Sequence, residues 1–448
     1  MNKHLPVIII GAGPVGLAAA AHLIDRRIQP LILEAGACAG SGITRWSGVR
    51  MFSPWHYSID SVAARLLSDS GWIAPPADGF PTGAELIEGY LRPLAATPQI
   101  AATLRCGAKV TAVTRAGRDL MSDAAREQQP FLVRYLDQDG EHELLARAVI
   151  DASGTIEQPN PLGASGIAAL GEAAAAERIH YGIPDVLGAD RDRYVGQRVL
   201  VVGSGHSAFN VLNDLAEISR THPATEVHWA TRRKDLRRVL GGGEHDQLIE
   251  RGKLGIRIGA LLNAGIVKHH AGFRLQRIRP VDGALAVDGG NAQSVLVDQI
   301  IGCTGYRPQL APLAELRIAL DPSTQSTPAL APLIDPNLHS CGSVRPHGAE
   351  ELKHPEKDFY IVGMKSYGRA PTFLLATGYE QVRSVVAAID GDWEAARRVE
   401  LKLPETGVCI TQFGDEGLAH PANDSCCTGT DPCACGTRTP SNKASCCG

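Results

Sequence analysis

The residues near the start of the chain that are best suited to chemistry are three glycines and one carboxylate. Gly11, Gly13 and Gly16 fit the pattern G-x-G-x-x-G, and Glu34 follows a second apolar run. In such a motif the first glycine permits a tight turn, the second leaves room for a pyrophosphate, and the third lets a helix pack closely. The carboxylate can accept hydrogen bonds from a ribose hydroxyl. The spacing therefore predicts a dinucleotide site.

These residues need a strand, a helix and a second strand to hold them. An apolar run at 7–10 precedes the glycines, an alanine-rich segment at 17–25 follows them, and a second apolar run covers 30–33. A short apolar run ended by glycine is typical of a buried parallel strand, and a helix N-terminus offers unpaired N–H groups to phosphate. Trp46 is a candidate cofactor contact because loops at such strand ends commonly carry binding residues.

A second unit repeats this pattern in the middle of the chain. An apolar strand at 198–202 leads into G-x-G-x-x-A, with a helix and a strand at 226–230 behind it. The expected cofactor contacts in this motif are Gly203, Gly205, Ser207 and Ala208. The second strand ends on Arg232 and Arg233 instead of an acid. Guanidinium groups bind phosphate bidentately, so we expect this unit to take NADPH; a solvated basic loop is the alternative.

The composition narrows the class of protein. The 448 residues are 44% hydrophobic and 21% charged, with a net charge of −4. This balance predicts no general affinity for nucleic acid or anionic membranes, and the chain lacks an uninterrupted apolar run of about 18 residues. The first residues could mimic a signal peptide, but cleavage there would remove the phosphate-binding glycines. We therefore expect a cytoplasmic enzyme.

Cysteine is concentrated at the end of the chain. Of the eleven cysteines, six lie in the last 23 residues: Cys426, Cys427, Cys433, Cys435, Cys446 and Cys447. Thiolates select soft ions such as Cu(I), Zn(II) and, by the same argument, trivalent arsenic or antimony. From residue 404 onward no periodicity remains, which predicts a disordered tail. A soft-ion site in this tail and an inert tail whose thiols oxidise are both open.

Three further stretches give the two units a family resemblance. Residues 151–155 (DASGT) are similar to an A-T-G hinge, 303–308 (CTGYRP) to a T-G-[YF]-x-P hinge, and 361–364 (IVGM) to a final flavin-facing strand that includes Gly363. Together they resemble flavoproteins with two dinucleotide-binding domains. The resemblance implies an α/β fold in which a Rossmann-like NADPH domain is inserted into a discontinuous FAD domain. The expected parts are FAD domain 1–160, NADPH domain 161–300, second FAD part 301–403 and Cys-rich tail 404–448.

Within these flavoproteins the chain resembles flavin-containing monooxygenases and related class B enzymes. It departs from them by lacking the F-x-G-x-x-x-H-x-x-x-[FY] signature of Baeyer–Villiger enzymes. Residues 341–348, 351–355 and 363–373 are similar to flavin monooxygenases of bacterial arsenic-resistance operons. That resemblance implies oxidation of trivalent arsenic or antimony species by O₂ with FAD and NADPH.

The candidate catalytic residues are Cys341, His347 and Arg45. Cys341 and His347 precede the flavin-facing strand, and Arg45 follows the first unit. A thiol there could hold a metalloid beside the flavin, although isolated cysteines are mostly small buried hydrophobes. Two other classes remain open. A disulfide reductase would need the tail thiols, since residues 1–403 hold no C-x-x-C or C-x₄-C pair; the other class is a soft-metal binding protein. A ferredoxin in place of NADPH also stays open.

Overall fold

The computed structural model describes residues 4–236, 239–240, 249–290, 292–337, 344–370 and 373–401. All elements below belong to one compact unit within residues 1–412. Cys341 and the six tail cysteines lie outside the described residues, so their expected roles stay predictions. None of the helices in the described ranges combines the length and apolar character needed to cross a bilayer.

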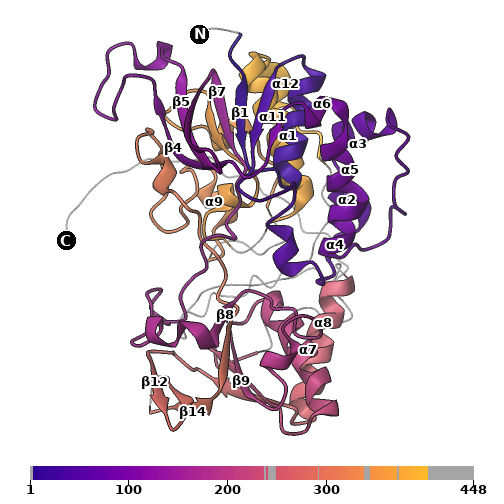
Figure 1. Cartoon of the computed structure of the whole chain (residues 1–448), viewed down its shortest axis with the longest axis vertical. Helices are drawn as coiled ribbons and strands as arrows, with labels where there is room; N and C mark the ends of the chain where they lie inside the picture. The colour runs from indigo at the N-terminus through magenta and orange to yellow at the C-terminus, as the bar shows by residue number, and fades with distance from the viewer. Residues whose placement is uncertain are drawn as a thin grey trace, which may run out of the picture. The chain divides into compact units, whose positions relative to one another are not determined.

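The first glycine motif belongs to a five-stranded parallel sheet (Figure 1). Its order is β16-β7-β1-β2-β3. The strands are β1 (Val7–Ile10), β2 (Pro30–Leu33), β3 (Leu104–Arg105), β7 (Ala148–Asp151) and β16 (Phe359–Ile361). Four strands come from the first part of the chain, and β16 joins them after a long excursion. Its main helices are α1 (Pro14–Asp25) and α11 (Leu375–Asp390).

The second glycine motif belongs to another five-stranded parallel sheet, ordered β11-β10-β9-β15-β8. The strands are β8 (Ile179–Tyr181), β9 (Arg198–Val202), β10 (Glu226–Thr231), β11 (Val267–Ala271) and β15 (Gln299–Gly302), with helices α7 (His206–Thr221) and α8 (Ile249–Asn263). Every strand of this sheet lies between β7 and β16 in the chain. The expected insertion of one Rossmann-like unit into another is therefore confirmed, while the domain boundaries to the residue stay predictions.

Two antiparallel sheets and several short helices complete the described chain. The sheets are β4 (Lys109–Arg115), β5 (Phe131–Asp137) and β6 (Gly140–Ala146), and β12 (Arg277–Val281), β13 (Ala284–Asp288) and β14 (Ser294–Val297). The helices are α2 (Trp55–Ser58), α3 (Ser61–Ser68), α4 (Gly83–Leu86), α5 (Arg92–Ala96), α6 (Pro98–Ala101), α9 (Ala331–Ile334), α10 (Ala349–Leu352) and α12 (Trp393–Arg397).

Two stretches whose residue patterns are typical of a single element are divided in the structure. Residues 295–301, which have the pattern of one strand, form β14 and β15 in different sheets; Asp298 between them accepts hydrogen bonds from the backbone and guanidinium of Arg198. Residues 83–96, which have the pattern of one helix, contain a π segment, Ile87–Leu91. Pro93 has no N–H to bond Gly89, whose carbonyl instead accepts from Trp72 Nε1 at 2.8 Å. The lost i→i−4 bond accounts for the local π geometry.

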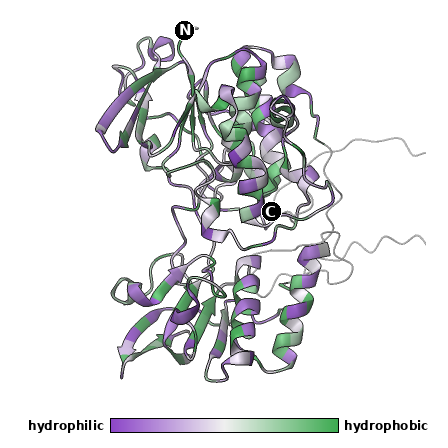
Figure 2. Ribbon diagram, turned by 45° about the vertical axis from the view of Figure 1, so that its right-hand side comes forward, coloured by the Kyte–Doolittle hydropathy of each residue, from purple (hydrophilic) through white to green (hydrophobic). Residues whose placement is uncertain are grey.

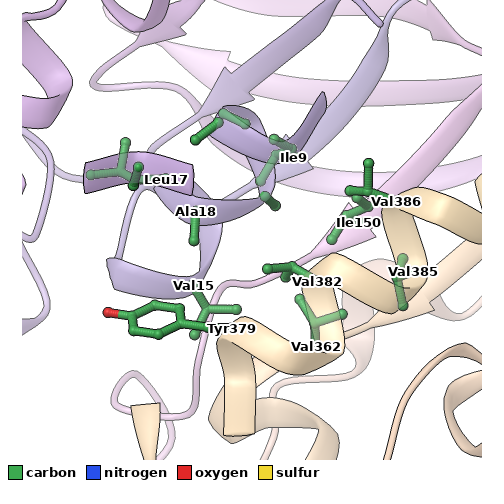
Figure 3. Close-up of a cluster of buried hydrophobic side chains, with 14 of the residues drawn as sticks. Ile9, Val15, Leu17, Ala18, Ile150, Val362, Tyr379, Val382, Val385 and Val386 are labelled. Atoms are coloured by element: carbon green, nitrogen blue, oxygen red, sulfur yellow. The ribbon is translucent and has the colours of Figure 1, made fainter. Parts of the chain in front are cut away.

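The core of the first unit is formed by β1, β7, α1 and α11 (Figure 3). Val15 and Ala18 on α1 face Val382 and Tyr379 on α11. The alanines at 18–21 are all buried, and their small side chains let α1 approach the sheet closely. Figure 2 shows hydrophobic residues gathered on the central strands and on the helix faces turned toward them. This packing holds the glycine turn at the carboxyl end of β1.

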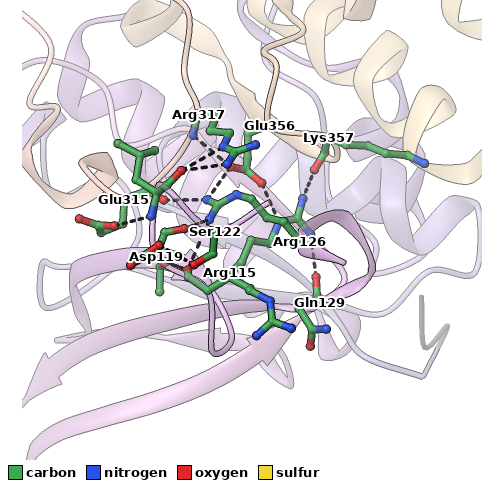
Figure 4. A network of polar contacts seen from close by, with 12 residues as sticks. Arg115, Asp119, Ser122, Arg126, Gln129, Glu315, Arg317, Glu356 and Lys357 are labelled. Atoms are coloured by element: carbon green, nitrogen blue, oxygen red, sulfur yellow. Dashed lines mark hydrogen bonds and ion pairs between the residues drawn. The ribbon is translucent and has the colours of Figure 1, made fainter. Parts of the chain in front are cut away.

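A buried ion network stabilises the first unit where β4 meets the segment before β16 (Figure 4). Glu356 accepts from Arg115 Nε at 2.7 Å and Arg126 Nη2 at 2.9 Å. Burial acts to raise the pKa of Glu356, but the hydrogen bonds from Arg317 N–H, Arg115 and Arg126 outweigh it and lower that pKa. The carboxylate is thus needed as an anion between two buried guanidinium groups.

Replacing this carboxylate should cost much of the stability of the chain. Glu356→Gln keeps the shape but leaves two buried guanidinium charges without a counter-ion, which typically costs about 3–5 kcal/mol. Urea unfolding at neutral pH measures the loss. The exposed pair of Glu143 with Arg134 gives the matched control, because Glu143→Gln should cost under about 1 kcal/mol. Equal losses in the two variants would contradict this account.

His354 predicts an acid-sensitive contribution to stability. Ala319 N–H donates to its Nδ1 at 3.3 Å, and its buried Nε2 has no hydrogen-bond partner among the described residues. Burial lowers its pKa from 6.5 to about 4. As the pH falls, His354 therefore binds a proton near pH 6.5 in the unfolded chain but only near pH 4 in the folded chain. Its contribution to the free energy of unfolding is present above pH 6.5 and is lost as the pH falls toward 4.

The expected loss from His354 is about 3 kcal/mol between pH 7 and pH 4. His354→Asn keeps an acceptor for Ala319 N–H but cannot titrate. Between pH 7 and pH 4 the free energy of unfolding, measured with urea, should therefore fall by about 3 kcal/mol less in this variant than in the wild type. His142, which is exposed and paired with Asp137 at 2.8 Å, provides the control substitution. An identical pH slope in the wild type and His354→Asn would refute the assignment.

Candidate dinucleotide sites

The first glycine turn is shaped as a phosphate cradle requires. Gly11 has φ +96°, and a Cβ there would lie 2.9 Å from Ser153 Cα; a Cβ on Gly16 would lie 2.0 Å from Gly11 O. Both positions therefore admit only glycine. A Cβ on Gly13, by contrast, would meet no heavy atom within 4 Å. The space beside the second glycine is open, as a pyrophosphate site needs.

The second turn has the same construction. Gly203 has φ +133°, and a Cβ there would lie 2.2 Å from Cys303 O, whereas a Cβ on Gly205 would meet nothing within 4 Å. The buried Ala208 takes the place of the third glycine, and Ser207 lies half-buried in the first turn of α7. The hinge predicted at 303–308 thus packs behind this turn, just as Ser153 of the hinge at 151–155 packs behind the first.

Both helices begin without a side-chain cap. The N-cap residues are Gly13 for α1 and Gly205 for α7, and neither helix has a capping side-chain hydrogen bond. No side chain therefore caps either helix N-terminus, and the helix dipole favours an anion there. These two helix ends fit the phosphates of two dinucleotides.

Glu34 supports the first turn as well as facing it. Ala12 N–H donates to Glu34 Oε2 at 2.7 Å, and Gly36 N–H donates to Oε1 at 2.8 Å. The half-buried carboxylate fixes the glycine turn against the next loop. A carboxylate has about four lone-pair positions, so two remain for ribose hydroxyls. The expected ribose contact stays a prediction.

The loop after β16 is supported by a hydrogen-bonded chain that includes His347. Gly363 N–H donates to Gln381 Oε1 at 2.7 Å, and Gln381 Nε2 donates to His347 Nε2 at 2.9 Å and to Ser366 Oγ at 2.9 Å. His347 Nδ1–H in turn donates to Arg345 O at 3.0 Å. A Cβ on Gly363 would lie 3.3 Å from Val15, so this loop lies against the first turn of α1.

The expected catalytic role of His347 stays a prediction, and the structure shows the residue in a supporting position. Its side chain is buried, with 2% of its surface exposed, and both ring nitrogens are engaged. Burial lowers its pKa, so the ring is neutral. A substrate cannot reach it without breaking the support of Gly363. His347 is therefore a positioning residue in this geometry.

Lys365 is a buried cation that sequence reasoning missed. Its Nζ donates to Asp151 Oδ2 at 2.7 Å and to Ser153 Oγ at 3.0 Å, and the lysine and aspartate side chains are almost fully buried. The pair joins the loop after β16 to the hinge behind Gly11. A lysine within the mostly apolar segment 359–367 was the available signal, because a buried lysine needs a counter-ion. Its partner lies 214 residues earlier, which no local pattern reveals.

Four other residues were predicted to belong to the sites, and each has its own contacts in the structure. Arg45 is exposed and pairs with Glu157 Oε1 at 2.7 Å, and half-buried Trp46 packs against Gly83 at the start of α4. Arg232, exposed just after β10, donates to Ala164 O at 3.4 Å, and Arg233 O accepts from Thr231 Oγ1 at 2.8 Å. These two arginines thus follow β10 where a 2′-phosphate is expected.

A segment of the first unit contacts the start of α7 beside a small cavity. The Phe52 ring lies 4.8 Å from the ring of His206, the first residue of α7. A cavity of about 170 Å³ adjoins this contact and is lined by Arg50, Phe52, Asn210, Glu250, Leu254 and Arg257. A larger one, about 570 Å³, is lined by Arg50, Trp55, Gly79, Phe80, Glu85, Glu88 and Gly89. No glycine of either motif lines either cavity.

Cys303 is the described cysteine nearest the hinges. It is buried behind Gly203, where its Sγ donates to Gly182 O at 3.4 Å. Burial raises the pKa of this thiol to about 12. It therefore packs as a small apolar side chain.

Comparisons with known proteins agree with this two-site architecture. A ferredoxin–NADP reductase from Salinispora tropica is 29% identical over 225 residues, 46% of this chain and 61% of the reductase. The chain thus spans less than two thirds of the curated relatives that it matches.

Two solved structures share the fold. Bacillithiol disulfide reductase from Bacillus cereus has a TM-score of 0.63 at 18% identity, covering 88% of this chain and 99% of the reductase. The cadaverine monooxygenase of desferrioxamine biosynthesis from Erwinia amylovora, solved with FAD, has a TM-score of 0.62 at 16% identity, covering 93% and 100%. The chain belongs to the pyridine nucleotide-disulphide oxidoreductase family, whose model matches residues 8–335.

Proposed function

We propose that the chain is an FAD- and NADPH-dependent monooxygenase in which FAD occupies the first glycine turn and NADPH the second. The observation that carries this assignment is the open space at both second glycines, Gly13 and Gly205, each at an uncapped helix end. The acid at Glu34 suits ribose hydroxyls, and the guanidinium groups after β10 suit a 2′-phosphate.

The chain's own residues bind and orient the cofactors. When bound, NADPH and FAD together supply the electrons that activate O₂, which is the redox chemistry that the protein side chains lack. Lys365 and Asp151 hold the loop after β16 against the hinge, and Gln381 holds Gly363 in place. These contacts fix the loop after β16 relative to the first glycine turn. The proposed reaction needs no side-chain nucleophile.

For the substrate we propose trivalent arsenic or antimony, such as arsenite, methylarsenite or antimonite. Support comes from the resemblance of residues 341–373 to monooxygenases of arsenic-resistance operons, and from the soft sulfur donors of Cys341 and the tail. Trivalent arsenic carries a lone pair that can accept an oxygen atom. In this proposal O₂ is the co-substrate and the protein works in the cytoplasm. Oxidation of the metalloid contributes to arsenic or antimony resistance.

The test is the rate of NADPH and O₂ consumption with and without each of the three metalloids. A substrate should raise both rates together, yield pentavalent product in equal amount, and leave hydrogen peroxide at or below its basal level. Failure of all three to stimulate either rate would remove the metalloid from the proposal. A rise in peroxide without oxidised metalloid would contradict the monooxygenase assignment.

A disulfide reductase is the second candidate, because reductases of this class share the family and the fold. Among the described cysteines, Cys303 is buried behind a glycine turn and has no cysteine partner, while Cys38 and Cys106 are exposed and free. A reductase needs a cysteine pair against the flavin, which these three residues do not form, so it would depend on the tail. Serine at all six tail cysteines should abolish reductase turnover but spare monooxygenase turnover. A ferredoxin donor would appear as turnover without NADPH.

A further inference from the structure

Two exposed thiols flank the carboxylate of the first site. Strand β2 pairs in parallel with β3, Ile32 opposite Leu104 and Leu33 opposite Arg105. The next pair in this register is Glu34 and Cys106. Glu34 N–H donates to Arg105 O at 2.9 Å, so the pairing continues past the strand ends. Cys106 therefore lies beside Glu34.

Cys38 approaches the same carboxylate from the loop after β2. Gly107 N–H donates to Gly36 O at 2.8 Å, which ties this loop to the segment that carries Cys106. The Cys38–Ser41 turn folds back over Gly36: Cys38 Sγ lies 3.7 Å from Ser41 Oγ, and a Cβ on Gly36 would lie 2.2 Å from Ser41 Cβ and 3.0 Å from Glu34 Oε1. Both cysteines are free and exposed.

The electrostatics agree with this placement. The pKa of the Cys106 thiol is raised by partial burial, by Glu34 and by Cys38. Cys106 is therefore a neutral thiol near pH 7 that responds to the other two groups. Such a thiol is a poor first target of an oxidant, so Cys38 is the candidate for the first attack and Cys106 for the second step.

We propose that Cys38 and Cys106 form a redox-active thiol pair that competes with the adenosine ribose for the Glu34 site. The oxidant is hydrogen peroxide. Cys38 sulfur attacks peroxide, its O–O bond breaks, and sulfenic acid and one water form. Cys106 sulfur then attacks Cys38 sulfur, the S–O bond breaks, and the disulfide and a second water form. Peroxide takes up the two electrons that the thiols lose.

A disulfide at this place would lie across the approach of a ribose to Glu34. Ribose binding and disulfide formation are therefore mutually exclusive, and by linkage each weakens the other to the same extent. The inference rests on the first turn being the FAD site.

The experiment follows the disulfide directly in the full-length chain. The FAD-free and FAD-saturated proteins are treated with hydrogen peroxide, remaining thiols are alkylated, and tryptic peptides are mapped by mass. Cleavage isolates Cys38 in peptide 28–45 and Cys106 in peptide 106–109. We expect a linked pair of these peptides that a reducing agent releases, formed about tenfold or more slowly when FAD is bound. Cys303, which is buried, should stay reduced.

Matched variants complete the test. Cys38→Ser and Cys106→Ser should each lose the linked peptides, and peroxide should then no longer lower FAD affinity, whereas the wild type should lose about tenfold or more. No linked pair, links to tail peptides instead, or equal rates with and without FAD would overturn the inference. Failure of the proposed function is separate, because it would appear as a protein that binds no FAD or consumes no NADPH, with the peptide map still readable.

Discussion

Gly205→Ala is expected to leave a folded, yellow, FAD-containing protein that NADPH no longer reduces. The new Cβ would meet no protein atom within 4 Å, and the residue has φ −88°, which alanine adopts freely. Alanine at this helix N-cap costs under about 1 kcal/mol. Its methyl group, however, fills the space where the pyrophosphate should lie. Losing about two charge-assisted hydrogen bonds weakens NADPH binding by roughly 100-fold or more.

The measurement is anaerobic flavin reduction at increasing NADPH concentration, with FAD content and thermal unfolding recorded beside it. Gly203→Ala is the contrasting variant, because its Cβ would lie 2.2 Å from Cys303 O at φ +133°. That variant should lose stability as well as activity. Normal reduction of the Gly205→Ala protein at low NADPH would mean that the pyrophosphate does not bind at this turn.

Gly13→Ala is expected to affect the other cofactor and to give a folded protein that is purified without flavin. The reasoning is the same, since Gly13 has φ −75° and open space at its Cβ position. FAD affinity should fall by roughly 100-fold or more, because the same kind of phosphate contacts is lost. Flavin fluorescence titration of the refolded or FAD-depleted protein measures this, and direct binding of NADPH should persist.

Gly16→Ala separates a damaged fold from a blocked site. Its Cβ would lie 2.0 Å from Gly11 O, so α1 would have to move away from β1. This variant should unfold at a lower temperature, whereas Gly13→Ala should not. If Gly13→Ala lost NADPH binding and kept FAD, the assignment of the two cofactors to the two turns would be reversed.

The parts of the site that follow from local chemistry could be predicted from the sequence. A glycine turn between a strand and a helix needs only neighbouring residues, so both cradles were found from G-x-G-x-x-[GA]. The insertion of one unit into the other was implied by the family resemblance, and in the structure strand β16 pairs with β7 after the chain returns from the second unit.

The contacts that tie distant segments together could not be predicted. His347 precedes the flavin-facing strand, but its role depends on Gln381, which reaches it from α11. The Lys365–Asp151 pair and the break at Asp298 likewise depend on partners across the fold. Residues of these types have many possible partners in the chain, and only the tertiary packing selects one.

The central claim is that electrons pass from NADPH at the second turn to FAD at the first. The most direct measurement is the visible spectrum of the purified protein during anaerobic addition of NADPH, followed by air. The account predicts a flavin spectrum that NADPH bleaches and O₂ restores, with NADH far less effective. A colourless protein that takes up no FAD, or a flavin spectrum that NADPH leaves unchanged, would contradict it.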